Sequence, residues 1–173
     1  QEEVVAREGG QNASDAGRGV DGITQLVFQK LSAKGEKKDK LVKLLKLDSA
    51  LQPRVKVFKD AERNRFFATS VEEFLESDEL NAILVRDFNT CGLGGQWDRY
   101  GKNDHFARLV CALNLEDKAD GDSASGGSYG LGKTAFAKSS NINTVIYHSV
   151  FTPSEQTENA HRRLMVSGIY PKH

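Results

Sequence analysis

The chain has 173 residues and a mass of 19.1 kDa, which suits one domain, because globular domains usually hold roughly 100–200 residues. Lys and Arg number 24, as do Asp and Glu, so the balanced charge excludes a wholly basic nucleic-acid-binding module but not a local basic patch. Two cysteines, Cys91 and Cys111, are too few for a disulfide framework or a zinc cluster, and the apolar runs are far shorter than the ~20 residues of a membrane span. We therefore expect a cytoplasmic protein with no membrane partner.

The first third of the chain predicts a helix, a strand and a second, lysine-rich helix. Residues 2–17 have apolar and small residues at helical spacing, although Gly9-Gly10 should interrupt that helix. A run of glycines then leads to a strand over 23–28. The helix expected over 34–47 has leucines on one side and lysines at 34, 37, 38, 40, 43 and 46. These lysines indicate either a solvated face or a contact for nucleic acid or a protein partner.

The middle of the chain predicts three strands and a short helix. Residues 54–59 and 65–69 suggest two short strands around a polar turn. Ser70 has the character of an N-cap for a helix that ends at Glu76. An apolar run over 81–86 predicts a buried strand that ends at Asp87.

The rest of the chain alternates glycine-rich loops with regular elements. A glycine-rich segment over 89–101 precedes an apolar helix expected over 105–115, and an acidic loop follows. Glycines at 126–132 then open a helix that ends near 139, and two paired strands follow over 143–151 and 163–170. This order predicts an α+β fold, a two-layer sandwich with helices layered on one sheet.

The glycine loop over 127–134 supports two interpretations. It satisfies the P-loop pattern, in which backbone amides and Lys133 hold phosphates and Thr134 holds magnesium. A P-loop needs an apolar strand directly before it, however, and the small, acidic residues 117–125 cannot form one. The other interpretation needs only the backbone amides at a helix N-terminus, which attract anions. We favour that interpretation and keep a P-loop NTPase as an alternative.

Two further groups of residues could surround a nucleotide. Glu8, Asn12 and Asp15 are four and three residues apart, so on a helix they project from one face. They suit a hard cation held by an amide oxygen, with a carboxylate to polarise water, although an ordinary polar helix face has the same spacing. Asp87 leaves a strand into a glycine turn, where it can accept a hydrogen bond from an exocyclic amine or cap the turn.

In this order the three segments resemble the GHKL superfamily, which includes gyrase, the ninety-kilodalton heat-shock chaperones, histidine kinases and MutL. Glu8-x-x-x-Asn12-Ala13-x-Asp15-Ala16 resembles its N box, residues 87–93 the first glycine box, and residues 127–132 the second. The resemblance is to an atypical, chaperone-like bacterial branch. It implies a Bergerat-type ATP-binding fold with a mixed sheet and helices on one face, an insertion at about 32–80 and an ATP lid at about 94–126.

The resemblance also implies roles for single residues. Glu8 would be the general base that activates the attacking water, and Asn12 would coordinate the Mg²⁺ that bridges the phosphates of ATP. Asp87 would accept a hydrogen bond from the adenine amino group, and Asp15 would shape the nucleotide site. The remaining nucleotide-binding residues would be Gly92, Leu93 and Thr144 near adenine, and Gly127, Ser128, Tyr129, Gly130, Leu131, Gly132 and Lys133 around the phosphates.

These roles predict an ATPase that slowly converts ATP and water to ADP and phosphate with Mg²⁺, and whose nucleotide state drives lid closure or homodimerisation in a larger machine. The alternative is a nucleotide-sensing interaction module that does not hydrolyse ATP, within a DNA-linked or antiviral defence protein. The lysines of residues 34–47 motivate that alternative because they could contact nucleic acid. We expect residues 1–173 to form a single domain and, because the chain has no initiating Met, to be a fragment of a larger protein.

Overall fold

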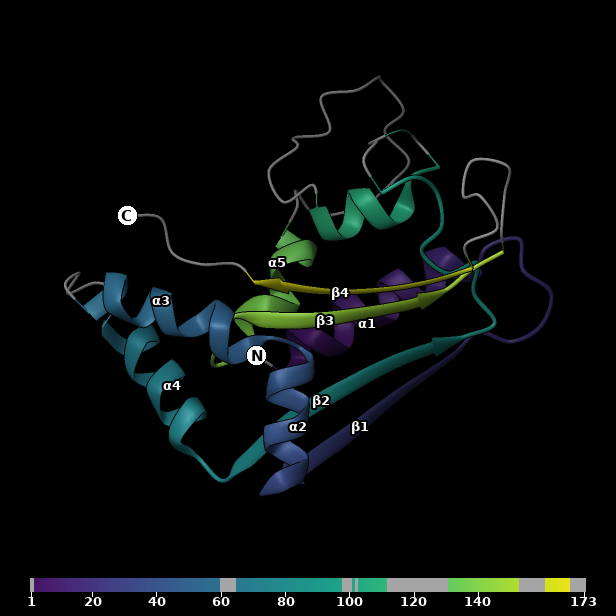
Figure 1. Cartoon of the computed structure of the whole chain (residues 1–173). Helices are drawn as coiled ribbons and strands as arrows, with labels where there is room; N and C mark the ends of the chain where they lie inside the picture. The colour runs from purple at the N-terminus through teal and green to yellow at the C-terminus, as the bar shows by residue number, and fades with distance from the viewer. Residues whose placement is uncertain are drawn as a thin grey trace.

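The computed structural model describes residues 2–59, 65–97, 101, 103–111, 131–152 and 161–168. Helices and strands are interspersed along this part of the chain, which confirms the α+β class. In chain order the elements are α1 (Glu2–Gly17), β1 (Gln25–Lys34), α2 (Glu36–Leu44), α3 (Leu47–Lys59), α4 (Arg65–Glu76), β2 (Glu79–Phe88), the π-helical turn η2 (Ala107–Cys111), α5 (Leu131–Lys138), β3 (Thr144–Val150) and β4 (Arg162–Gly168) (Figure 1).

The strands pair as two separate antiparallel sheets. β1 pairs with β2 along the whole length of both strands, so that Gln25 lies opposite Phe88 and Lys34 opposite Glu79. β3 pairs with β4, which confirms the strand pair expected near the end of the chain. The expected single mixed sheet does not occur among the described residues, because both ladders are antiparallel and neither is hydrogen-bonded to the other.

Helix α1 is continuous through Gly9 and Gly10, where the sequence predicted an interruption. Gly9 is buried against the β1–β2 sheet: a Cβ there would lie 3.4 Å from Val85 Cγ1 and 3.5 Å from the ring of Phe28. The glycine therefore allows the helix to approach the sheet closely, and this contact offsets the low helix propensity of the residue. Because successive side chains of a strand point to opposite faces, Phe28 and Val85 and every second residue from them along β1 and β2 point toward α1.

The expected insertion at about 32–80 consists mainly of three helices that gather at the end of β1 and the start of β2 (Figure 1). The strands expected over 54–59 and 65–69 are wrong, because these residues belong to α3 and α4. Ser70 is buried inside α4 and is not an N-cap. The buried side chains recur at helical spacing and form one apolar cluster: Val42, Leu47, Leu51, Val55, Phe58, Phe67, Ala68 and Val71.

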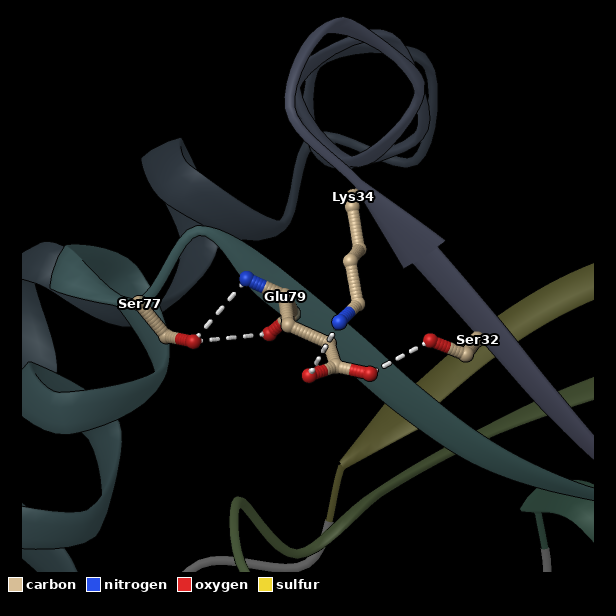
Figure 2. A network of polar contacts seen from close by, with 4 residues as sticks. All are labelled: Ser32, Lys34, Ser77 and Glu79. Carbon is tan, nitrogen blue, oxygen red and sulfur yellow. Dashed lines mark hydrogen bonds and ion pairs between the residues drawn. The ribbon is translucent and has the colours of Figure 1, made fainter.

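Polar contacts join the end of β1 to the start of β2 and to the turn that precedes it (Figure 2). Ser32 Oγ donates to Glu79 Oε1 at 2.6 Å, and Lys34 Nζ lies 3.4 Å from Glu79 Oε2. The hydrogen bond from Ser32 is the main reason why the pKa of Glu79 lies below its ordinary value of 4.5, and the charge of Lys34 adds to it while partial burial opposes it. Ser77 Oγ bridges the backbone N–H and C=O of Glu79, each at 3.0 Å, and so fixes the turn between α4 and β2.

A second set of buried apolar side chains lies around the loop after β2, η2, α5 and the end of β3. Its members are Phe106, Ala107, Val110, Ala135, Ala137 and Phe151. On β3, burial raises the pKa of the Tyr147 phenol above its ordinary value of 10.0. Within the described ranges, no helix is both long and apolar enough to cross a membrane.

Candidate functional site

The acidic and amide residues of α1 share one face, as their spacing predicts. At the 100° per residue of an α-helix, Glu8, Asn12 and Asp15 lie within an arc of about 60°. Their exposure rises along the helix, because Glu8 is buried at 5% exposure, Asn12 is half-buried and Asp15 is exposed. This acid–amide face is therefore covered at its N-terminal end and open at its C-terminal end.

Both carboxylates of the acid–amide face have an arginine partner. Arg7 donates from Nε and Nη2 to Glu8 Oε1, at 3.4 and 3.2 Å. Arg18 Nη2 lies 3.0 Å from Asp15 Oδ1, and both of these side chains are exposed. Before Glu8 can use Oε1 to accept a proton from water, it has to release Arg7.

Asp87 lies on the face of the β1–β2 sheet that α1 covers. Gly9 contacts Val85, and Asp87 is two residues further along β2, so its side chain points to the α1 side of the sheet. Gly9 is only about 60° from Asn12 around the helix, so the β2 side and the acid–amide face are neighbours. The Asp87 carboxylate is exposed, which leaves it accessible to a ligand.

The opposite side of α1 has a different pocket. A depression of about 410 Å³ lies between α1 and the start of β1, and it is lined by Gly10, Ala13, Ser14, Gly17, Arg18, Thr24 and Leu26. Around the helix, these residues of α1 are about 160° from the acid–amide face. Leu26 pairs with Asp87 across the β1–β2 ladder, so these two side chains lie on the same face of the sheet and the depression adjoins the position of Asp87.

The first glycine segment is tightly packed against β3. Asn89 has a φ of 55° and donates from Nδ2 to Ile23 O at 2.8 Å, which ties the end of β2 to the loop before β1. Gly92 has a φ of 67°, and a Cβ there would lie 2.1 Å from Val150 O. The next residue, Leu93, donates its backbone N–H to Ser149 Oγ at 2.7 Å. Gly92 thus has a packing role in addition to the predicted role beside adenine.

Thr144 lies far from this segment. It begins β3, and Val150, which contacts Gly92, ends it, so six strand steps of about 3.3 Å separate them by about 20 Å. Thr144 Oγ1 donates to Ile142 O at 2.9 Å, which closes the turn before the strand. The structure therefore does not bring Thr144 and Gly92 to one adenine pocket.

Most of the second glycine segment lies outside the described residues. This applies to Gly127, Ser128, Tyr129 and Gly130, and to most of the expected ATP lid. Leu131, Gly132 and Lys133 form the first turn of α5, which begins where a phosphate-binding helix was predicted and packs against α1. Among the described residues, no three His, Cys, Asp or Glu side chains gather as a metal site, so a bound Mg²⁺ would depend on Asn12 and on the phosphates.

Not all of the lysines predicted at positions 34–46 form a free, exposed surface: one is buried and two others form ion pairs. Lys38 is buried at 5% exposure, and its Nζ donates to Leu75 O at 3.0 Å and to Ser77 O at 2.5 Å. Lys34 pairs with Glu79, and Lys40 Nζ lies 3.8 Å from Glu36 Oε2. The exposed lysines that remain at this surface and carry no recorded ion pair among the described residues are Lys37, Lys43 and Lys46.

Two charged residues beside the first glycine segment were missed by sequence reasoning. Asp104 is buried at 7% exposure, and its carboxylate accepts the backbone N–H of Gln96 at 2.7 Å and of Gly101 at 2.9 Å. Arg163 Nη2 donates to Gly95 O. An Asp directly before an apolar helix is a helix-start signal that could have indicated Asp104, whereas nothing local to β4 indicates Arg163.

Comparisons of the chain with protein-family models, with curated protein sequences and with solved structures found no match. What the site can bind is therefore indicated by the donor and acceptor groups of its own residues. The amide oxygen of Asn12 suits a hard cation, and the exposed carboxylate of Asp87 can accept a hydrogen bond from an amine.

Proposed function

We propose that this chain is an ATP-binding domain of GHKL type, with a Bergerat-type sandwich, that slowly hydrolyses ATP in the presence of Mg²⁺. The observation that carries the proposal is the unbroken α1, which aligns Glu8, Asn12 and Asp15 on one face and packs on the face of the β1–β2 sheet to which Asp87 points. Helix α5 packs against the same helix. Three segments that are distant in the sequence therefore meet at α1, as a shared nucleotide site requires.

Each of these side chains has a chemically suitable task. Asn12 offers the amide oxygen that a hard cation accepts, and Asp87 offers an exposed carboxylate for the adenine amino group. Bound Mg·ATP would supply the phosphoryl group that is transferred to water, and its Mg²⁺ would neutralise negative charge on the phosphates. Glu8 would take the proton from water once it has released Arg7.

The Arg7–Glu8 contact also favours a second candidate function. Arg7 occupies Oε1 of Glu8, so while this contact persists that oxygen is not free for a water molecule, and the chain could bind nucleotide without turning it over. Such a protein would be a nucleotide-sensing interaction module. Arg7→Ala separates the two functions, because it should raise turnover in an ATPase and leave a non-hydrolysing module inactive.

Titration calorimetry and a phosphate-release assay test the proposal on the same samples. Asp87→Asn should weaken the binding of Mg·ATP by on the order of tenfold or more, because it removes a charged hydrogen-bond acceptor. Glu8→Gln should keep binding and lose turnover. Asp39→Asn, at an exposed position on α2, is the matched control and should change neither. Absence of any binding of ATP or ADP by the unaltered chain would refute the proposal.

The proposed partners require separate tests. Analytical ultracentrifugation with and without a non-hydrolysable ATP analogue measures whether the nucleotide drives homodimerisation. For nucleic acid, charge reversal at Lys37, Lys43 and Lys46 should abolish any salt-dependent binding of DNA, because these lysines are exposed. Lys38 should not be part of such a surface, since it is buried.

A further inference from the structure

The loop after β2 is held from two directions at Gly95 and Gln96. On one side, Asp104 Oδ1 accepts the backbone N–H of Gln96 at 2.7 Å. On the other side, Arg163 of β4 donates to the carbonyl oxygen of Gly95. Gly95 has a φ of 83°, and a Cβ there would lie 2.4 Å from Asp104 Cα, so only a glycine fits between these two contacts.

Arg163 is half-buried, and its guanidinium lies near two aromatic rings. Its guanidinium carbon lies 4.7 Å from the ring centroid of Phe151 and 5.3 Å from that of Phe106, and both rings are buried. Stacking against aromatic faces stabilises a guanidinium and fixes its plane. The neighbouring Arg162 is exposed, since successive strand residues point to opposite faces of a sheet.

Within the described ranges, one nitrogen of this guanidinium lacks a hydrogen-bond partner. Nη1 of Arg163 is buried and makes no hydrogen bond in the described part of the protein. A buried polar group without a partner is unfavourable, and it calls for a physical explanation where it occurs. Leaving this position would expose Nη1 to water, which offsets part of the free energy that the contact to Gly95 contributes.

We propose that Arg163 is a positioning residue that latches Gly95 and Gln96 to the β3–β4 sheet, and that opening of this latch releases the segment directly after Leu93. The latch joins β4 to the first glycine segment, whose Leu93 is already bonded to Ser149 of β3. A consequence rests on the proposed function: because this segment follows Asp87, the closed latch favours nucleotide binding by keeping the rim of the site in place.

Amide hydrogen exchange on the full chain without nucleotide tests the latch directly. Arg163→Met keeps the apolar stem beside the two rings but removes the donor, whereas Arg163→Lys keeps a donor for Gly95. We expect exchange at Leu93 and Gln96 to become faster by on the order of tenfold in Arg163→Met, and to return most of the way toward the original rate in Arg163→Lys. Arg162→Met is the matched control and should leave exchange at these amides unchanged.

The outcomes separate this proposal from the proposed function. Unchanged exchange in a folded Arg163→Met variant, or equal acceleration in the Met and Lys variants, would overturn the latch. If Arg163→Met does not fold, Arg163→Lys alone still decides, because its exchange at Leu93 and Gln96 should stay within threefold of the original rate, on the order expected for a retained contact. Calorimetry with Mg·ATP then reports independently: no binding by the unaltered chain would refute the nucleotide site and leave the exchange result standing.

Discussion

Replacement of Lys38 by Met tests how the inserted helices are fastened to the rest of the protein. The Lys38 ammonium lies at the C-terminal end of α4, donates to the carbonyl oxygens of Leu75 and Ser77, and is 5.8 Å from the ring centroid of Phe74. Met keeps the apolar stem and removes the charge and all three N–H donors. The variant therefore isolates the polar contribution of Lys38.

The expected loss of stability follows from the two hydrogen bonds. Each hydrogen bond to a charged group contributes about 1.5–3 kcal/mol, and the favourable interaction of a cation with the helix C-terminus adds to them. The Met variant avoids the desolvation cost of burying an ammonium, which offsets part of this sum, so we expect Lys38→Met to lower the free energy of unfolding by about 2–4 kcal/mol. At about 2–4 °C per kcal/mol for a chain of this size, the melting temperature should fall by about 4–16 °C.

Urea denaturation followed by circular dichroism measures this free energy. The matched control is Lys37→Met on the same helix, where the side chain is exposed and the change should stay within about 0.5 kcal/mol. Equal stability of the Lys38 and Lys37 variants would refute the assignment of Lys38 as a buried helix cap.

Three further predictions concern stability. The hydrogen bond from Ser32 is the main cause of the lowered pKa of Glu79, so the ionised carboxylate stabilises the folded state above its ordinary pKa of 4.5. This contribution is lost as the pH falls through the lowered value. Glu79→Gln should therefore reduce the acid dependence of the free energy of unfolding, measured in urea denaturation series below about pH 4.5. Gly10→Ala should stabilise the protein by up to about 1 kcal/mol, because no atom would obstruct the new Cβ in α1. Gly92→Ala should destabilise the protein, because Gly92 has a positive φ and a Cβ there would clash with β3. The melting temperatures of the two variants should therefore shift in opposite directions. Leu51→Ala should lower the free energy of unfolding by about 2–5 kcal/mol because Leu51 is fully buried, and a loss below about 1 kcal/mol would contradict its place in the core.

The elements that could be predicted from sequence are those whose apolar spacing is local and extends over enough residues to distinguish a helix from a strand. The strand pair at the end of the chain and the face shared by Glu8, Asn12 and Asp15 follow from strand and helix periods alone. The end of α3 and the start of α4 were mistaken for strands because short windows rich in Val and Phe favour strands. The helical spacing of Leu47, Leu51 and Val55 becomes evident only over three turns.

The parts that could not be predicted depend on contacts between distant residues. Gly9 is compatible with a helix because the β1–β2 sheet approaches it closely, and no local pattern contains that contact. The same holds for Lys38, whose carbonyl partners lie on another helix, and for Arg163, whose acceptor is Gly95. Such side chains have the same local signature as exposed ones, because only the tertiary fold decides whether they are buried.

Nuclear magnetic resonance of the ¹⁵N-labelled chain, titrated with Mg·ATP, tests the nucleotide site most directly, because it reports both binding and location. We expect the largest saturable changes in amide chemical shift around Asn12 and Asp87, on the β2 side of α1. Changes confined to the inserted helices α2, α3 and α4 would contradict the proposed site. The absence of any saturable change would contradict nucleotide binding altogether.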